Sequence, residues 1–200
     1  YGVAPDHPEV KSVQDDFEEV ATNERFSYAG HVFVGHPEDA PDHAGPVIPL
    51  NELMSLYDAV VVATGCDLPR SLDLPGAELD GVVNARAFVG WYNAEPTFSH
   101  LLLPEVTDQL RTVIIGHGNV ALDCARVLAA PSTHLEATDI HEEAFEALQR
   151  LPSKRLIHVV GRRGATQAAF TTKEVRELTE LDNAALVIDP AELREGDTDA

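Results

Sequence analysis

The fold is decided by residues 112–127, which read T-V-I-I-G-H-G-N-V-A-L-D-C-A-R-V. Residues 113–115 form an unbroken β-branched run, which predicts a strand buried on both faces of a parallel sheet. Gly116 and Gly118 follow at once and predict a sharp turn, because glycine adopts backbone angles closed to other residues and leaves no Cβ between the chain and a ligand. The pattern over residues 120–128 then predicts a helix.

This strand, turn and helix fit the G-x-G-x-x-A form of the dinucleotide-binding fingerprint, in which Ala121 is small enough for the helix to pack closely on the strand. The first amides of a helix have no partner within it, and the helix dipole is positive at that end. A pyrophosphate is therefore expected at this turn. A purely structural glycine turn is the alternative interpretation.

The next strand is predicted at residues 156–160, and the residues that follow it indicate which dinucleotide binds. Arg162 and Arg163 stand there. A carboxylate at this place would accept hydrogen bonds from the 2'-hydroxyl of NAD, whereas two guanidinium groups pair with the 2'-phosphate of NADP. Asp139 could be mistaken for that carboxylate, but it precedes a helical pattern and has Glu142 three residues later, so we interpret it as a helix cap. The sequence therefore predicts NADP, although two adjacent arginines can also be solvated surface charge.

Composition narrows the classes of function. The chain has 200 residues, of which 34 are acidic and 14 basic, and its net charge of -20 argues against nucleic acid or an anionic membrane as a partner. No apolar run approaches the roughly 18 residues of a membrane span. Cys66, Cys124 and the nine histidines show no metal-ligand spacing, so we predict no metal site. So few cysteines favour a reducing compartment, with the cytoplasm as the default.

The strong acidity, together with only three lysines, suggests the hypothesis of a protein adapted to high salt. Charge repulsion is screened when the Debye length falls to about 3 Å near 1 M salt. An acidic protein from an arginine-preferring genome is the alternative. The chain also does not begin with Met, and we expect it to be a piece of a longer protein.

The rest of the chain is predicted to hold further helices and strands. Residues 8–21 carry apolar side chains at spacings of three and four, which predicts a helix with its apolar face in the core. Alternation over residues 25–35 predicts paired strands, and residues 57–65 read as a buried strand that ends in a turn of small residues. A helix is predicted at 172–181 and a third strand at 185–188.

The segment A-R-A-F-V-G-W-Y-N, residues 85–93, gathers aromatic side chains beside one arginine. Such a cluster belongs either to the core or to a hinge surface that meets a cofactor. A boundary between a first domain and a nucleotide-binding domain is expected between Leu103 and Arg111, after a linker rich in loop-forming residues.

Several segments together resemble the adrenodoxin-reductase type of ferredoxin-NADP reductase, a family of two-domain flavoproteins. They are Y-G-V-A-P-D-H-P-E-V-K at 1–11, Y-D-A-V-V-V-A-T-G at 57–65, G-V-V-N-A-R-A-F-V-G-W-Y-N at 81–93, G-H-G-N-V-A-L-D-C-A-R-V-L at 116–128 and G-R-R-G-A-T-Q-A-A-F-T-T-K-E-V-R-E-L at 161–178. Their order and spacing are specific, whereas any one alone is weak evidence.

The resemblance implies an α/β protein of the doubly wound, Rossmann-like class. Residues 1–105 would form part of an FAD-binding domain with a linker, and residues 106–200 would form an NADP-binding domain. The implied activity is that of an oxidoreductase that passes electrons between NADPH and a ferredoxin-type iron-sulfur protein through FAD. Hydride carries two electrons and the iron-sulfur carrier accepts one at a time, so a flavin stands between them.

The resemblance also implies roles for particular residues. His7 and Asp123 match positions near the flavin that relay protons or orient the nicotinamide. Glu174 would contact the ribose or amide on the nicotinamide side. The residues expected to hold the NADP phosphates are Gly116, His117, Gly118, Asn119, Val120, Ala121, Arg162 and Arg163, and those expected to line the FAD adenosine are Val32, Val34, Ala63, Thr64 and Gly65.

The chain departs from the family pattern in three respects. It contains neither the first G-x-G-P-A-G flavin fingerprint nor the late G-W-x-x-x-G-P-x-G segment. His117 stands where the family usually has an amide, and the acidity fits poorly with an acidic ferredoxin. The alternatives are a glutamate-synthase-like flavoprotein reductase, a disulfide-reductase-like enzyme, for which the expected C-x-x-C is missing, and a noncatalytic nucleotide-binding module.

Overall fold

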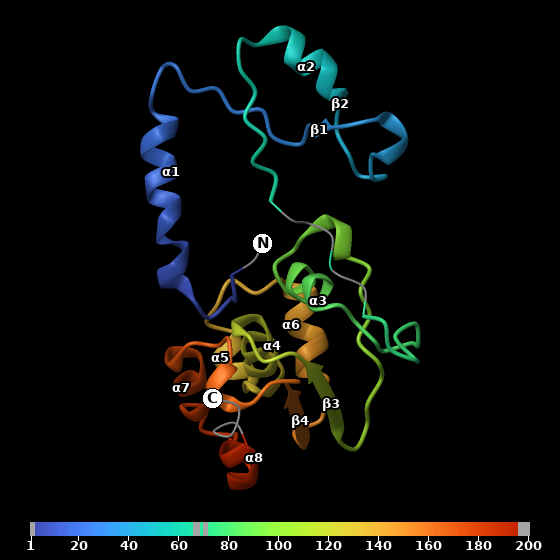
Figure 1. The fold of residues 1–200 in the computed structure, drawn as a ribbon, viewed down its shortest axis with the longest axis vertical. Coiled ribbons are helices and arrows are strands. Elements are labelled where there is room, and N and C mark those ends of the chain that lie inside the picture. The colour runs from blue at the N-terminus through green and yellow to red at the C-terminus, as the bar shows by residue number, and fades with distance from the viewer. Residues whose placement is uncertain (1–2, 66–68, 70–71, 196–200) are drawn as a thin grey trace. The chain divides into compact units, whose positions relative to one another are not determined.

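A computed structural model of the chain describes residues 3–65, 69 and 72–195. The chain forms two compact units, one made of residues 9–77 and the other of residues 1–8 together with 78–200. Figure 1 shows helices and short parallel sheets in an α/β arrangement. The predicted boundary between cofactor domains near residue 105 stays a prediction.

The smaller unit contains one short parallel sheet. Its elements are the 3₁₀ helix η1 (Pro8–Ser12), which begins at the last residue of the other unit, and α1 (Val13–Ala21), β1 (Phe33–Val34), the 3₁₀ helix η2 (Pro37–Asp39), β2 (Val47–Ile48) and α2 (Leu50–Leu56). Strand β1 pairs with β2 in parallel. The predicted strand pattern at 25–35 therefore survives only as the two residues of β1.

Two predictions for this unit are wrong. Helices η1 and α1 form where one helix was expected, but their apolar residues are exposed and do not form a core; these are Val10, Val13, Phe17 and Val20. Residues 57–65 have no strand structure, and Val61 is 87% exposed. A buried strand needs hydrogen-bonding neighbours on its sides, and β1 and β2, of two residues each, are the only other strands that the described part of this unit offers.

The larger unit has a parallel strand pair at its centre. Its elements are α3 (Ala85–Tyr92), the 3₁₀ helix η3 (Pro96–Phe98), β3 (Leu110–Ile115), α4 (Asn119–Ala129), α5 (Ser132–Leu135), α6 (Glu142–Gln149), β4 (Arg155–Val160), the 3₁₀ helix η4 (Ala165–Gln167), α7 (Thr172–Thr179) and α8 (Pro190–Glu195). Strands β3 and β4 pair in parallel over their whole length, from Leu110 opposite Arg155 to Ile115 opposite Val160. The predicted strand, turn and helix of the fingerprint are thus confirmed.

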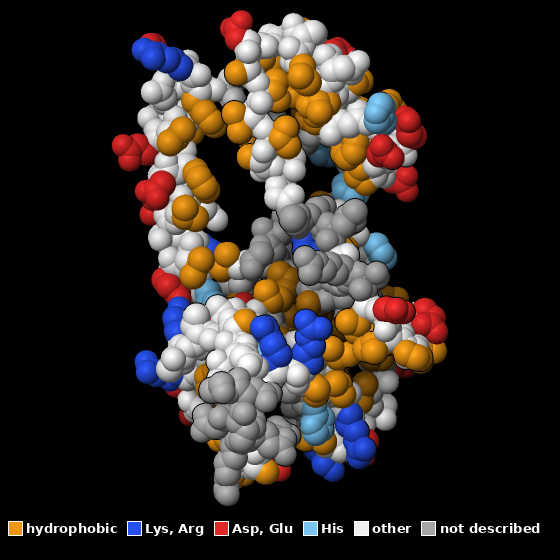
Figure 2. Space-filling model, viewed as in Figure 1, with side chains coloured by type: hydrophobic (Ala, Val, Ile, Leu, Met, Phe, Trp, Pro, Cys, Tyr) orange, Lys and Arg blue, Asp and Glu red, His pale blue; other side chains and the backbone are white. Residues whose placement is uncertain are grey.

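One face of this strand pair packs on the core and the other is open. Burial alternates along β3, with Val113 62% and Ile115 61% exposed. The prediction of a strand buried on both faces is therefore wrong, because the described residues cover only the face that carries Leu110 and Ile114. Apolar side chains are visible at the surface of both units in Figure 2.

The core of the larger unit joins α3 and α4 to α6 and α7. Helix α3 contributes Phe88, whose ring contacts those of Trp91 and Tyr92 on the same helix. Helix α4 contributes Leu122 and Val127. The aromatic segment is therefore core, which was one of its two interpretations. Cys124 is buried as a free thiol, and Cys66 lies outside the described residues.

Other predicted elements differ in detail. Helix α7 confirms the helix expected from Thr172, but residues 185–188 form no strand and Val187 is 87% exposed. The N-cap residue of α6 is His141, whose side chain makes no capping hydrogen bond, so the interpretation of Asp139 as the N-cap is wrong. Over the described residues, no helix combines the length and the apolarity needed to cross a membrane.

Candidate functional site

The glycine turn that follows β3 faces open space. Gly116 has φ +124, a backbone angle that other residues rarely adopt, and a Cβ added to it would meet no heavy atom of the described residues within 4 Å. Gly118 has φ -100, an ordinary angle, and a Cβ there would also meet nothing. Neither backbone strain nor packing within the described residues requires glycine at position 118, so an approaching ligand is the remaining physical reason for it.

The amino end of α4 points its amides at this turn. The first hydrogen bonds of the helix run from the amides of Ala121 and Leu122 to the carbonyl of Gly118. The amides of Asn119 and Val120 lie before these bonds, and no side chain caps the helix. This end of the helix therefore offers backbone donors and a positive dipole to an anion.

The segment that carries the two arginines lies directly beside the glycine turn. Because Ile115 pairs with Val160, the residues after β3 and after β4 are neighbours. The amide of Gly116 donates to the carbonyl of Val160 at 2.8 Å. Arg162 and Arg163 follow Val160 by two and three residues, and both are exposed.

Further contacts fix this segment to the turn. The His117 ring packs over Gly161, where a Cβ would overlap it, and lies edge-on to Phe170 with 6.3 Å between ring centroids. Gly118 forms a parallel bridge with Ala169. The backbone amide of Thr171 donates to Asn119 Oδ1 at 2.8 Å. The Asn119 side-chain oxygen therefore binds the protein backbone, and the backbone amide of Asn119 is left for a ligand.

His117 does not point into the open space as a free side chain. Its Nε2 is buried and has no hydrogen-bond partner among the described residues. The glycine turn and the arginine segment are thus held together by an imidazole that still has an unused polar atom.

A second group of predicted residues gathers around a buried guanidinium. Arg126, on α4, is 2% exposed and contacts the carboxylates of Asp6, Asp123, Glu174 and Glu177. We call these five residues together with His7 the Arg126 cluster. All of them belong to the same unit, because residues 3–8 pack with it.

His7 lies inside this cluster. Its side chain is buried, and His7 Nε2 lies 2.7 Å from Glu177 Oε2. One ligand-type atom each of His7, Asp123 and Glu174 lies within 4.8 Å of the others. The structure therefore brings His7 and Asp123 together although 115 residues separate them in the sequence, and it places Glu174 beside them.

The charges of the cluster are unbalanced. Four ionised carboxylates around one guanidinium leave three negative charges unless His7 or a carboxyl group binds a proton. Burial raises the pKa of Glu174, and the neighbouring Asp123 charge raises it further. Burial also acts to raise the pKa of Asp6, but the Arg126 hydrogen bonds and charge outweigh it and lower that pKa to about 2. The cluster therefore holds two carboxyl groups whose pKa values are shifted in opposite directions.

The same three side chains, His7, Asp123 and Glu174, have the spacing of a possible cation site. Two of their carboxylates already contact Arg126. A divalent ion would have to share them with a fixed positive charge, so these contacts give it little to bind.

The residues expected to line an FAD adenosine lie in the smaller unit. Val32 is half-buried, Val34 at the end of β1 is exposed, and residues 63–65 are exposed. Gly65 has φ +69, and a Cβ there would meet no heavy atom of the described residues. As at Gly116, the backbone at Gly65 takes an angle suited to glycine and faces open space.

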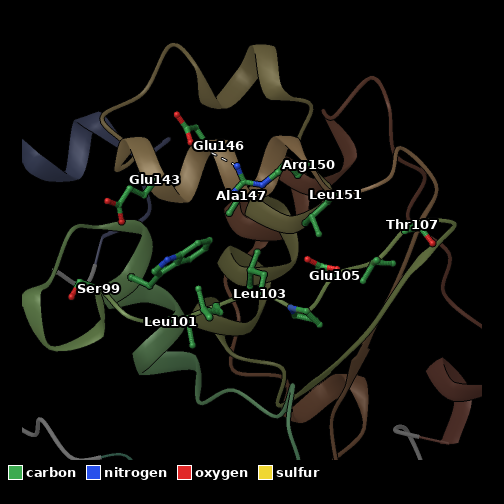
Figure 3. A pocket seen from close by; sticks show the side chains of 14 residues that line it. Ser99, Leu101, Leu103, Glu105, Thr107, Glu143, Glu146, Ala147, Arg150 and Leu151 are labelled. Carbon is green, nitrogen blue, oxygen red and sulfur yellow. Dashed lines mark ion pairs between the residues drawn. The ribbon is translucent and has the colours of Figure 1, made fainter.

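A pocket of about 520 Å³ lies elsewhere in the larger unit. Figure 3 shows it between α6, with Arg150 just after the helix, and the segment that contains Leu101, Leu103 and Glu105. Helix α6 supplies Glu143, Glu146 and Ala147. None of the residues predicted to bind a cofactor lines it. Acidic side chains at its rim make it a poor site for the phosphates of a dinucleotide.

Known proteins resemble this chain along nearly its whole length. No protein-family model matches the sequence. The chain is 46% identical over 198 residues to the NADPH-ferredoxin reductase FprA of Mycobacterium tuberculosis strain H37Rv, covering 99% of this chain and 40% of that protein. It is 45% identical over 192 residues to mitochondrial NADPH:adrenodoxin oxidoreductase of Bos taurus, covering 96% of this chain and 36% of that protein.

Solved structures agree with the sequence relatives. The structure of Mycobacterium tuberculosis FprA in complex with NADPH aligns with a TM-score of 0.86 and 45% identity, over 97% of this chain and 40% of that chain. The chain is homologous to the adrenodoxin-reductase type of ferredoxin-NADP reductase. It spans about 40% of the length of the FprA proteins that it matches.

Sequence reasoning missed four members of the site of this ferredoxin-NADP reductase homologue or its surroundings. They are Asp6, Arg126, Glu177 and His134, whose Nε2 lies 3.2 Å from Asp6 Oδ2. Helical spacing could have found two of them, because Arg126 stands one turn after Asp123 and Glu177 one turn after Glu174. No local pattern marks Asp6 or His134.

Proposed function

We propose that the protein containing this chain is an NADPH-ferredoxin reductase, an FAD-dependent oxidoreductase that passes electrons between NADPH and a ferredoxin-type iron-sulfur protein. The observation that carries the proposal is the position of the open glycine turn beside the Arg162–Arg163 segment. The homology to NADPH-ferredoxin reductases supports it. We further propose that the chain contributes to two doubly wound domains, with residues 1–105 on the FAD side and 106–200 on the NADP side.

In this proposal the glycine turn holds the NADP pyrophosphate. Gly116 and Gly118 leave room for it, and the amides of Asn119 and Val120 donate to it. Ala121 donates its own amide to Gly118 and keeps α4 close to β3. His117 contributes by fixing the turn to Gly161, and its unused Nε2 gives it a further polar atom.

Arg162 and Arg163 select NADP over NAD in this proposal. Their guanidinium groups pair with the 2'-phosphate through charge-assisted hydrogen bonds, which a 2'-hydroxyl cannot replace. The contacts of His117 and Asn119 with Gly161 and Thr171 support this role, because they fix both ends of the segment that carries the arginines.

The Arg126 cluster would handle protons near the nicotinamide. A bound flavin supplies the step between two-electron hydride transfer and single-electron transfer. His7 holds or releases a proton at Nε2, where Glu177 can take part. Asp123 and Glu174 orient the nicotinamide end, and burial raises the pKa of Glu174 and so favours its protonated form.

The smaller unit would contribute to the FAD site. Val32 and Val34 would line the adenosine, and the turn at Ala63, Thr64 and Gly65 would let the backbone come close to it. The exposure of the turn and the positive φ of Gly65 support this assignment. Because few FAD contacts come from these residues, we do not expect the 200 residues alone to retain FAD.

We propose a ferredoxin or a similar iron-sulfur carrier as the partner. The net charge of -20 would repel an acidic carrier at low ionic strength, so high salt or basic surfaces outside this chain would have to permit docking. We also propose a reducing compartment such as the cytoplasm. Burial raises the pKa of the Cys124 thiol to about 12, which suits a structural thiol that stays reduced.

The test uses the complete gene product that contains this chain. We expect it to be yellow, with flavin absorbance, and to reduce ferricyanide and an iron-sulfur protein at the expense of NADPH. A protein that binds NADPH but carries no flavin and reduces neither acceptor would instead be a noncatalytic nucleotide-binding module. Reduction of ferricyanide without reduction of any iron-sulfur protein would favour the glutamate-synthase-like alternative.

A further inference from the structure

Each of the three nitrogens of the Arg126 guanidinium contacts at least one carboxylate. Its Nε and Nη2 bind the two oxygens of Asp6 at 2.7 and 3.0 Å, and Nη2 also binds Asp123 at 2.8 Å. Its Nη1 lies 3.1 Å from Glu174 Oε2 and 3.2 Å from Glu177 Oε2. An arginine has five N–H donors in a rigid planar fork. Four of these contacts are hydrogen bonds, and the fifth, to Glu177, is an ion pair.

These contacts tie together the two groups that define where His7 lies. Asp6 precedes His7 in the chain, and Glu177 binds its ring at 2.7 Å. Both carboxylates are held by the same guanidinium, Asp6 through one edge and Glu177 through Nη1. Arg126 therefore holds the backbone of His7 through Asp6 and the ring of His7 through Glu177.

Other contacts of this segment do not join it to α4. His134 Nε2, on α5, lies 3.2 Å from Asp6 Oδ2. Asn93 Nδ2 donates to the carbonyl of Val3 at 2.9 Å, and the amide of His7 donates to the carbonyl of Ala4 at 3.1 Å. The Asn93 contact lies four residues from His7, and the contact with Ala4 is internal to the turn. The paired hydrogen bonds from Arg126 to Asp6 are thus the nearest link between the turn and α4.

We propose that Arg126 is a positioning residue that sets His7 for proton transfer by holding Asp6 and Glu177 at the same time. The inference rests on the proposed function, because it takes His7 to be the proton-handling group. Lysine cannot replace Arg126, since one ammonium nitrogen cannot meet both oxygens of Asp6 and the carboxylates on α7. The alternative is an ordinary buried ion pair, which would affect stability alone.

The mildest test is Asp6→Asn in the complete gene product, because this variant keeps the shape of Asp6 and removes its charge. We expect kcat for NADPH-dependent ferricyanide reduction to fall by about 10- to 100-fold, as for a reacting group displaced by about 1 Å. KM for NADPH should stay within about threefold, because Asp6 is not among the residues proposed to hold the nucleotide.

The matched control is Glu95→Gln. Glu95 is also a buried carboxylate paired with an arginine in the same unit, Arg86, but it is not in the Arg126 cluster. We expect this variant to lose stability while kcat stays unchanged. A merely structural role for the Asp6–Arg126 pair predicts the same result for Asp6→Asn, and an unchanged kcat in Asp6→Asn would overturn the proposal.

A double-mutant cycle tests whether Arg126 acts through Asp6. We expect Arg126→Gln to lower kcat at least as much as Asp6→Asn, and the double variant to be no worse than Arg126→Gln alone. Additive losses would overturn the proposal. Should Arg126→Gln fail to fold, Asp6→Asn and Glu95→Gln decide the question without it.

Crystal structures of the two single variants give a readout that does not depend on activity. We expect the contact between His7 Nε2 and Glu177 Oε2 to be lost in Asp6→Asn and kept in Glu95→Gln. A retained contact in Asp6→Asn overturns the positioning role. If the parent protein shows no NADPH oxidation, the proposed function fails, and the positioning of His7 is still judged by this contact.

Discussion

Asp6 is a buried carboxyl group whose contribution to the stability of the fold can be measured. Its carboxylate is held by Arg126, and its pKa is lowered from 3.8 to about 2. A carboxyl group whose pKa is lower in the folded state stabilises the fold above its unfolded pKa, and this contribution is lost as the pH falls toward the folded pKa. Since one pKa unit corresponds to about 1.4 kcal/mol, Asp6 contributes about 2 kcal/mol at neutral pH.

Urea unfolding at pH 6 and pH 2 measures this contribution. We expect the parent protein to lose about 2 kcal/mol more on acidification than Asp6→Asn, since asparagine has no proton to bind. Equal losses in the two proteins would contradict the ion pair between Asp6 and Arg126.

Tyr92 carries a buried hydroxyl with no apparent use in the core. The residue is 0% exposed, and its hydroxyl has no hydrogen-bond partner among the described residues. An unpaired buried hydroxyl costs free energy, so we expect Tyr92→Phe to raise the free energy of unfolding by about 1 kcal/mol. Tyr57→Phe, at an exposed site, should change nothing. A loss of stability in Tyr92→Phe would show that the hydroxyl has a partner.

Residue-level prediction from the sequence worked where chemistry fixes a motif and failed where distant charges meet. Gly116 and Gly118 could be singled out because a tight turn next to a ligand has few alternatives. Helical spacing places Arg126 one turn after Asp123, but its contact with Asp6, 120 residues away in the sequence, could not be predicted from a local pattern. His7 was linked to Asp123 only through the family resemblance, because no local pattern joins them.

At the scale of elements, Gly118, which follows His117, and Gly161, which lies against the His117 ring, are glycine for different reasons. Gly118 needs to be glycine for no reason within the described fold, whereas a Cβ at Gly161 would overlap the His117 ring. We expect Gly118→Ala to leave the free energy of unfolding within about 1 kcal/mol and to weaken NADPH binding. We expect Gly161→Ala to destabilise the fold by about 1 to 3 kcal/mol.

Urea unfolding and NADPH titration distinguish these outcomes. Addition of His117→Ala should restore part of the stability lost in Gly161→Ala, because it removes the overlapping ring. If Gly118→Ala bound NADPH as tightly as the parent protein, the pyrophosphate would not lie at the glycine turn.

The elements predicted well are those that find their neighbours within the described chain. Strands β3 and β4 pair with each other, and α4 covers one face, so the pattern at 112–127 was sufficient. Residues 57–65 and 185–188 have similar apolar patterns but no strand in the structure. Their sequences encode a preference for extended structure, and the partner strands that would stabilise it are not among the described residues.

At the scale of the whole molecule, the net charge of -20 opposes compaction. Salt screens this repulsion over the Debye length, about 10 Å at 0.1 M and about 3 Å at 1 M. If the protein is adapted to high salt, we expect its Tm to rise by several degrees between 0.1 and 1 M KCl and to rise less in sucrose of equal osmolality. An equal rise in both, or none, would favour the arginine-preferring genome.

The selection of NADP by Arg162 and Arg163 is the central claim. A titration of the protein with NADPH and NADH tests it most directly. The control for the double variant Arg162→Ala/Arg163→Ala is Arg150→Ala/Lys154→Ala, which removes the same charge at the opposite end of β4. We expect NADPH affinity to fall about 100-fold in the double variant, as for two lost charge-assisted hydrogen bonds. NADH affinity should change less than about threefold, and the control variant should change neither affinity. Equal losses for NADPH and NADH would contradict the assignment of the 2'-phosphate to Arg162 and Arg163.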